Sequence, residues 1–136
     1  MDFNQQIVDT FRANGGEVNE PMRFGTNLVL VHVPKKDGTE RVTPLAAVQQ
    51  GGAWHVAGSA GGSPRHPAWV FALRRAERVT IEVPGDPVET VPVSVTEVTG
   101  PERDAMWERF KQFSSGFAEY EEKAQGRIIP IFRLTA

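Results

Sequence analysis

The sequence predicts a mainly β, α+β protein, a small barrel of about six antiparallel strands with N-terminal, central and C-terminal helices. Short apolar or alternating stretches are separated by Gly and Pro turns, as in antiparallel sheets. Helical patterns interrupt these stretches at three places rather than after every strand, so the alternation typical of a doubly wound sheet is absent. The length of 136 residues suits one domain spanning residues 1–136.

The first half of the chain is expected to contain one helix and three strands. An apolar face at helical spacing, followed by Asn-Gly-Gly, predicts a helix over 2–14. The run T-N-L-V-L-V-H-V-P predicts a buried strand over 26–34. An Asp-Gly turn over 35–39 then leads into a returning strand over 41–48. A second turn, Q-G-G, precedes a third strand over 53–58.

The second half is expected to contain three more strands and three helices. Pro67 and Pro101 suit the first turn of a helix, because proline lacks the amide hydrogen that this position leaves unused. Alternation of apolar and polar residues predicts strands, and helical spacing predicts a further short helix. The expected segments are strands over 79–83, 88–98 and 127–134 and a helix over 117–124.

Composition excludes several classes of protein and site. The chain has no cysteine, which excludes disulfides, thiol nucleophiles and iron–sulfur clusters. Its three histidines do not occur at metal-ligand spacing, so no metal site is predicted. The start of the sequence lacks the features of a signal peptide, and no apolar run is long enough to cross a bilayer. We therefore expect a cytoplasmic protein without an integral membrane segment.

The distribution of charge indicates a local anion site. The whole chain has a formal net charge of −2, yet residues 35–78 contain seven basic and three acidic side chains. A basic middle in an acidic protein suggests a bound anion, whereas a nucleic-acid-binding protein would more usually be basic overall. The basic residues form two sets, one at the 35–41 hairpin and one after the Gly-rich stretch, which we expect to converge on one anion.

Residues 59–73, S-A-G-G-S-P-R-H-P-A-W-V-F-A-L, are the most informative stretch. A Gly-rich loop that opens into a helix offers free backbone amides and a helix N-terminus to a phosphate-bearing ligand. Nothing else in the chain supplies reactive chemistry, so an enzymatic reaction here would depend on a bound cofactor. His66 is expected to cap or orient this loop rather than to act in catalysis.

Two other patterns have a structural explanation beside a functional one. A-G-S-A-G at 57–61 is faintly similar to the nucleophile elbow of hydrolases, but the acid and base that must follow are missing, so a serine hydrolase is rejected. Phe113, Phe117 and Tyr120 have the spacing of a helix face. That face either packs in the core or forms an aromatic wall beside a flat ring.

Four motifs along the chain fit one known pattern. They are F-R-A-N-G-G at 11–16, K-D-G with Arg41 and T-P-L at 36–45, S-x-G-G with H-P-x-W and Leu73 at 59–73, and Tyr120 with R-x-I-P at 127–130. Together they resemble the deazaflavin-dependent nitroreductase family, actinobacterial proteins that use coenzyme F420. The third motif is the most specific. Ala60, Ala72 and Asp37 depart from the residues that the family usually has at these positions.

The resemblance implies a split β-barrel of the flavin-reductase type with the deazaflavin in a groove against it. Lys36 and Arg41 would hold the phosphate and acidic tail, and Tyr120 or Ser59 would donate a proton or contact the substrate. The implied cofactor contacts are Lys36, Arg41, Pro44, Leu45, Ser59, Ala60, Gly61, Gly62, Arg65, Trp69, Ala72 and Arg75.

The implied activity is hydride transfer from reduced F420 to a small electron-poor acceptor such as an enone, a quinone or a nitro compound. Two alternatives stay open at this point. One is a non-catalytic barrel that binds the cofactor or a lipid, and the other is a relative that binds FMN or haem. The sequence does not decide between a monomer and a homodimer.

Overall fold

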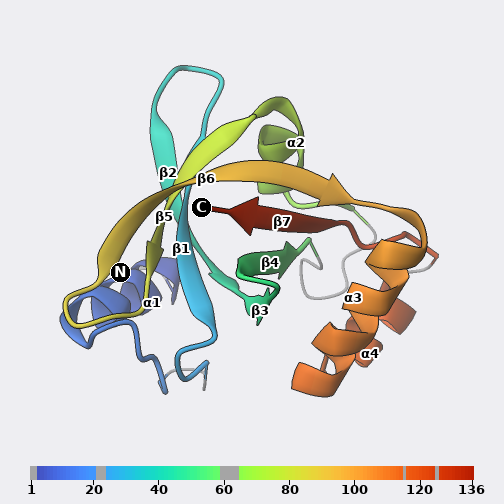
Figure 1. The fold of residues 1–136 in the computed structure, drawn as a ribbon, viewed down its shortest axis with the longest axis horizontal. Coiled ribbons are helices and arrows are strands. Elements are labelled where there is room, and N and C mark those ends of the chain that lie inside the picture. The colour runs from blue at the N-terminus through green and yellow to red at the C-terminus, as the bar shows by residue number, and fades with distance from the viewer. Residues whose placement is uncertain (1–2, 21–23, 59–64, 115, 125) are drawn as a thin grey trace.

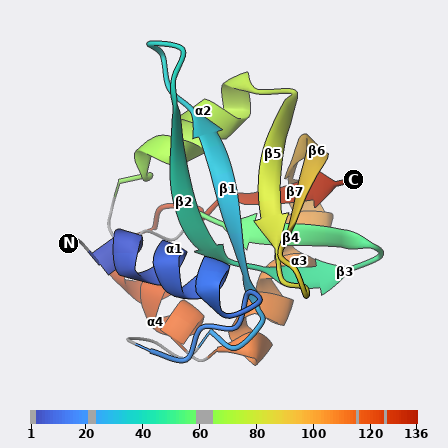
Figure 2. The same cartoon turned by 90° about the vertical axis from the view of Figure 1, so that its left-hand side faces the viewer.

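The computed structural model describes residues 3–20, 24–58, 65–114, 116–124 and 126–136 of the chain. Seven antiparallel strands form one curled sheet in the order β2-β1-β5-β6-β7-β4-β3, with four helices around it (Figures 1 and 2). The strands are β1 Leu28–Pro34, β2 Glu40–Ala46, β3 Val48–Gln50, β4 Ala53–Ala57, β5 Arg78–Val83, β6 Glu89–Val98 and β7 Ile131–Thr135. The helices are α1 Phe3–Ala13, α2 Ala68–Arg75, α3 Gly100–Phe113 and α4 Gly116–Lys123.

The break between β2 and β3 explains why the sheet curls. These two strands lie at opposite ends of the sheet order, yet only Ala47 separates them in the chain. The Ala47 amide donates to the Asn27 carbonyl over 3.0 Å, and beyond this point the chain pairs with β4 instead of β1. The expected split barrel is thus confirmed. The single strand predicted over 41–48 is wrong, because the chain bends there to join the two edges.

Strand β1 is buried on both faces over most of its length, which accounts for its apolar sequence apart from His32. Val29, Val31 and Val33 belong to the core inside the curled sheet, and Leu28 and Leu30 belong to a second cluster that packs under α1. Side chains alternate between the two faces of a strand, so this division follows from the sequence register alone.

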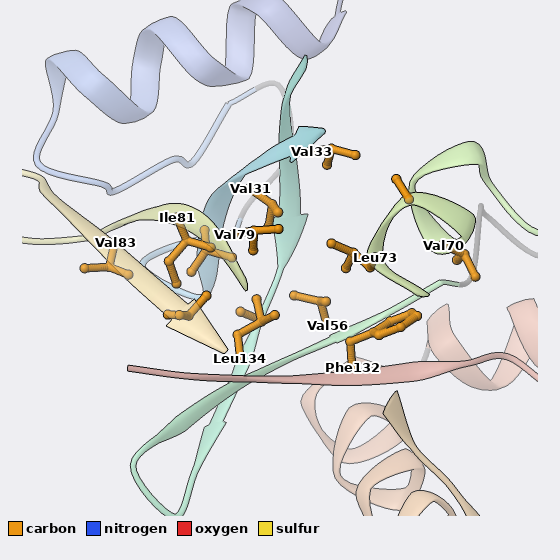
Figure 3. Packing of buried hydrophobic residues seen from close by; sticks show 14 residues of the cluster. Val31, Val33, Val56, Val70, Leu73, Val79, Ile81, Val83, Phe132 and Leu134 are labelled. Atoms are coloured by element: carbon orange, nitrogen blue, oxygen red, sulfur yellow. The ribbon is translucent and has the colours of Figure 1, made fainter. Parts of the chain in front are cut away.

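The core inside the sheet also contains the buried face of α2. In Figure 3, Leu73 of α2 points towards Val56 of β4, and Val70 of the same helix belongs to the cluster that also contains Val33 and Phe132. Both α2 side chains are at most 1% exposed, so the helix is firmly seated on the concave side of the sheet. This burial places the other face of α2 beside the β1–β2 hairpin.

Helices α3 and α4 pack together at the end of the sheet where β6 ends and β7 begins, and they form the connection between these two strands (Figure 1). Their contact is aromatic: the rings of Phe110 and Phe117 meet edge to face with centroids 5.2 Å apart, and Trp107 and Phe117 do the same at 5.8 Å. Such pairs stabilise beyond the apolar area that they bury. Among the described residues, no helix is long and apolar enough to span a bilayer.

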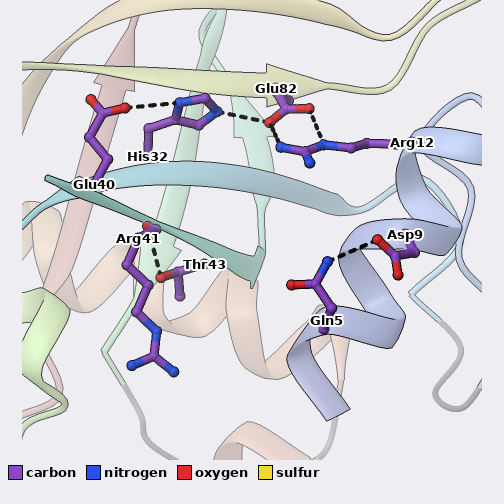
Figure 4. A network of polar contacts seen from close by, with 8 residues as sticks. All are labelled: Gln5, Asp9, Arg12, His32, Glu40, Arg41, Thr43 and Glu82. Carbon is purple, nitrogen blue, oxygen red and sulfur yellow. Dashed lines mark hydrogen bonds and ion pairs between the residues drawn. The ribbon is translucent and has the colours of Figure 1, made fainter. Parts of the chain in front are cut away.

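A row of charged side chains fastens α1 to the outer face of the sheet (Figure 4). The Arg12 guanidinium donates to both carboxylate oxygens of Glu82, over 2.9 and 2.7 Å. His32 Nε2 lies 2.8 Å from Glu82 Oε2, and its Nδ1 lies 3.4 Å from Glu40 Oε1. The hydrogen bond from Arg12, with that from His32, holds the pKa of Glu82 below its usual value.

Replacing the buried carboxylate tests this anchor. Glu82→Gln keeps the shape but removes the charge that Arg12 and His32 face, so we expect the free energy of unfolding at pH 7 to fall by about 1–2 kcal/mol, a figure that allows for the exposure of Arg12. Urea unfolding measures the difference. Glu89→Gln, which changes an exposed carboxylate on the neighbouring strand, is the matched control and is expected to have little effect.

The native protein and Glu82→Gln also test how this stabilisation depends on pH. A carboxyl group whose pKa is lowered in the folded state contributes its full stabilisation above its ordinary pKa of 4.5. That stabilisation is lost as the pH falls through the pKa of the folded state. The stability gap between the native protein and Glu82→Gln should therefore be constant near neutral pH and close in acid. A difference in stability that persists unchanged in acid would contradict the role of ionised Glu82 in this anchor.

Candidate active site

A pocket of about 560 Å³ opens between the β1–β2 hairpin and α2. Three parts of the chain that are distant in sequence contribute its walls: the start of α1, the hairpin and one face of α2. The residues that line it are Asn4, Val33, Pro34, Lys35, Lys36, Arg41, Thr43, Ala68, Trp69, Phe71, Ala72 and Arg75.

The hairpin wall follows from strand alternation. Arg41 pairs with Val33 and Thr43 pairs with Val31, so both side chains are on the concave face of the sheet. Figure 4 shows Arg41 pointing away from the row formed by Glu40, His32 and Glu82 on the other face. Alternation therefore sends the strand's acidic residue outwards and its basic residue to the pocket.

The turn of the hairpin keeps its own acidic residue occupied. Asp37 Oδ1 accepts hydrogen bonds from the amide and the hydroxyl of Thr39, over 2.9 and 2.6 Å. These bonds hold the pKa of Asp37 below its usual value, so the carboxylate is charged at neutral pH. Its other carboxylate oxygen, Oδ2, lies 4.0 Å from Lys35 Nζ, and Asp37 is not among the residues that line the pocket.

The helix wall has an apolar part and a basic end. Ala68, Phe71, Ala72 and Arg75 recur at three- and four-residue intervals and so share one face of α2. Phe71 is 47% exposed. Trp69 lies at the edge of this face, and its ring is 6.0 Å from that of Phe132 in β7. The pocket therefore presents apolar surfaces next to cations.

Four lining side chains are cationic, and none of the lining residues in the described part of the chain is a carboxylate. Lys35, Lys36 and Arg41 come from the hairpin, and Arg75 comes from α2. The adjacent Arg74 is bound elsewhere, donating to both carboxylate oxygens of Glu97 over 2.9 and 3.0 Å. An arrangement of this kind favours an anion.

Five of the cofactor contacts expected from sequence meet in this pocket, namely Lys36, Arg41, Trp69, Ala72 and Arg75. The structure separates three others from it. Pro44 pairs with Leu30 on the α1 side of the sheet, Leu45 packs against the internal core, and Arg65 is exposed ahead of α2.

The remaining predictions divide into two groups. Ser59, Ala60, Gly61 and Gly62 lie outside the described residues. Tyr120 is on α4, where its ring meets that of Phe117 edge to face at 5.7 Å, and it does not line the pocket. Its expected role as proton donor or substrate contact stays a prediction. Phe117 is buried in the core, as the ordinary explanation of that aromatic spacing required.

Three polar or aromatic lining residues were not predicted from the sequence, namely Thr43, Phe71 and Asn4, whereas Lys35 belonged to the basic set expected at the 35–41 hairpin. Thr43 lies within the hairpin motif, and the two-residue alternation from Arg41 would have identified it. Phe71 could have been found from its position three residues after Ala68 on a helix that is buried on its other face. Asn4 had no sequence signal, because it reaches the pocket only through the way that α1 packs.

Comparison with known proteins now adds to this geometry. Residues 4–136 match the sequence profile of the family described as F420H(2)-dependent quinone reductase. The chain belongs to this family. It is therefore an F420H2-dependent reductase, and coenzyme F420 is its cofactor, as the resemblance had implied.

Solved structures agree with the family. An F420-H2 dependent reductase, FDR-A, is 31% identical, with 79% of this chain and 93% of that chain covered and a TM-score of 0.69. A protein described as a domain-swapped dimer is 27% identical, with 96% and 94% covered and a TM-score of 0.71. HutZ, a heme storage protein from Vibrio cholerae, shares the fold at 14% identity, with 99% and 90% covered and a TM-score of 0.55.

The side chains of the pocket suit this cofactor. F420 combines a flat tricyclic ring with a phosphate and an acidic tail, and the pocket combines apolar walls with four cations. Ala72 has a small side chain that is largely buried against the core, so the middle of the helix wall projects little into the pocket. The fit concerns chemistry and size, which are the properties that the described residues define.

Proposed function

We propose that the pocket between the β1–β2 hairpin and α2 binds F420, and that the protein transfers a hydride from the reduced cofactor to an electron-poor acceptor, a quinone, an enone or a nitro compound. The observation that carries this proposal is the meeting of hairpin and helix cations in one apolar-walled pocket. Neither basic set alone would distinguish a ligand site from a solvated surface.

The cations would hold the anionic part of the cofactor. Lys36 and Arg41 would contact the phosphate and acidic tail, with Lys35 and Arg75 adding positive charge from the two sides. Arginine can donate two parallel hydrogen bonds to a phosphate, whereas lysine acts as a point charge. A set that contains both types would orient the tail as well as attract it.

The apolar residues would receive the ring. Trp69, Phe71, Ala72 and Val33 offer a surface on which a flat ring system packs, and their packing excludes water from the side of the ring that they cover. When bound, reduced F420 supplies the hydride that the reaction needs. The chain's own contribution is therefore to position the cofactor, neutralise its tail and keep the site dry.

The character of the pocket also argues for the acceptor class. The described lining residues include no carboxylate, histidine or thiol, so this part of the pocket wall offers none of these groups to activate a poorly reactive substrate. An acceptor that is itself electron-poor requires no such help. Quinones, enones and nitro compounds share this property, and a quinone agrees best with the family.

Removing either main cation should weaken cofactor binding. A charge-assisted phosphate contact is worth about 1.5–3 kcal/mol, so Lys36→Ala and Arg41→Ala should each reduce the affinity for F420 by about tenfold or more. Titration of the cofactor's fluorescence with purified protein measures the dissociation constant. Arg78→Ala, which removes an exposed arginine bonded to Ser94 on β6, should leave it unchanged. Native F420 affinity in all three variants would show that the phosphate binds elsewhere.

Filling the pocket from the helix wall tests where the ring lies. The large ring introduced by Ala72→Phe would occupy space that the cofactor needs, so F420 affinity should fall by about tenfold or more. Ala118→Phe makes the same change at an exposed position of α4 and should bind normally. Thermal unfolding of both variants shows whether the fold is kept. A folded Ala72→Phe protein that binds F420 as tightly as the native one would contradict this placement.

A panel of acceptors tests the substrate class. With reduced F420 and native protein, we expect turnover of at least one quinone, enone or nitro compound, and little with unactivated alkenes or simple ketones, because only the former accept a hydride readily. Oxidation of the cofactor is followed by its absorbance. Tight binding without turnover of any acceptor would support a non-catalytic cofactor carrier instead.

A further inference from the structure

One arginine outside the pocket connects the two chain segments that precede and begin α2. Arg127 Nη1 lies 2.9 Å from the Gly58 carbonyl, to which it donates, and 2.6 Å from Nδ1 of His66. Gly58 directly follows β4, and His66 stands two residues before α2. An amino group of arginine carries two hydrogens, so a single nitrogen can serve both acceptors.

The arrangement fixes the state of the histidine. A guanidinium can only donate, so His66 Nδ1 must accept and the ring's one proton is on Nε2. Burial, and then the charges of Arg127 and Arg74, lower the pKa of His66 below its usual value, while Glu97 opposes them. The ring also meets Phe71, a pocket residue, edge to face at 5.8 Å. Neutral His66 thus links Arg127 to the pocket wall.

Close packing at Gly58 shows that this junction has little freedom. A Cβ built on Gly58 would lie 2.5 Å from Val70 Cγ2 on α2 and 3.1 Å from Pro130 Cγ on the segment before β7. The Gly58 amide donates to the Pro130 carbonyl over 2.8 Å. The end of β4, the helix α2 and the segment 127–130 therefore meet at one point. Arg127, which belongs to that segment, contacts Gly58 directly after β4 and His66 just ahead of α2.

We propose that Arg127 is a positioning residue for the cofactor pocket, because its bonds to the Gly58 carbonyl and His66 fix where α2 begins. This inference rests on the proposed function of the pocket. Arg74 and Glu97 fasten the far end of α2 to β6, so the helix is held at both ends by guanidinium groups. Arg127 itself does not line the pocket and acts through the placement of Trp69, Ala72 and Arg75.

The contact should fail in acid. Protonation puts a second N–H on the ring, at the nitrogen that faces Arg127, so the hydrogen bond is lost and two positive charges are opposed. The usual pKa of histidine is 6.5 and that of His66 is lower, so the hydrogen bond between Arg127 and His66 is intact at neutral pH. It is lost as the pH falls through the pKa of His66. Cofactor affinity should then decrease together with the protonation of His66.

The test compares four variants by F420 fluorescence titration from pH 5 to pH 8. At pH 8, Arg127→Met should weaken binding by about tenfold, within the range known for residues that act through packing, and Arg127→Lys should restore part of it. His66→Gln can accept from Arg127 without titrating, so it should bind normally at pH 8 and lose less affinity in acid than the native protein. Dividing the dissociation constant of each variant by that of the native protein at the same pH removes the effect of the cofactor's own titration.

Arg103→Met is the matched control. Arg103 also donates to a backbone carbonyl of this segment, that of Ile129 over 3.1 and 2.8 Å, but its ring contact is with Trp107 and not with the start of α2. It should lower thermal stability and leave both the affinity and its pH dependence unchanged. A loss of affinity in this variant equal to that in Arg127→Met would show a general effect of stability.

Nuclear magnetic resonance of the His66 ring gives a readout without cofactor. We expect the Nε2–H tautomer in the native protein and a higher His66 pKa in Arg127→Met. Unchanged F420 affinity in folded Arg127→Met, or a His66 titration identical in both proteins, overturns the inference. Normal binding by Lys36→Ala and Arg41→Ala, with weakened binding by Arg127→Met, would instead overturn the proposed placement of the phosphate. Absence of F420 binding by the native protein would overturn both.

Discussion

The seating of α2 on the concave side of the curled sheet is the interaction on which the rest of this structure depends. Val70 and Leu73 complete a core that strands β1, β4, β5 and β7 leave open, so the helix is held by apolar burial. Because that face is buried, the orientation of the helix is fixed, and its opposite face lies beside the β1–β2 hairpin. Without the helix, the hairpin cations would be an ordinary solvated turn. Burial of one helix face therefore creates the pocket on the other.

The pocket is positive because the nearby acids are engaged with other partners. Strand alternation and turn geometry direct these carboxylates mainly to basic or hydroxyl groups outside the pocket lining, although Asp37 Oδ2 also lies 4.0 Å from Nζ of the lining residue Lys35. The lining itself contains four cations and, among the described residues, no carboxylate. The pairs outside the lining are Asp37 with Thr39, Glu40 with His32, Glu82 with Arg12 and Glu97 with Arg74. A formal net charge of −2 is thus compatible with a strongly basic site.

Local patterns in the sequence were enough for most elements and for a small antiparallel barrel, because alternation, turn residues and helical spacing each act over a few positions. The split form of the barrel was implied by the family resemblance. The local patterns failed at Ala47, where a bend that joins two sheet edges is a property of the whole sheet. The site was predicted in part for a similar reason. Lys36, Arg41, Trp69 and Ala72 stand in motifs, and Arg75 lies two residues beyond one. By contrast, Asn4 lines the pocket and Pro44 is separated from it only through tertiary packing. Arg127 was noted only as part of a motif, since its partners are more than 60 residues away.

A structure of the protein with F420 bound would locate the cofactor directly. We expect the acidic tail against Lys36, Arg41 and Arg75, with the ring along Trp69 and Ala72 between the hairpin and α2. A cofactor seated instead against α3 and α4 beside Tyr120, with the hairpin cations facing solvent, would contradict the proposed placement.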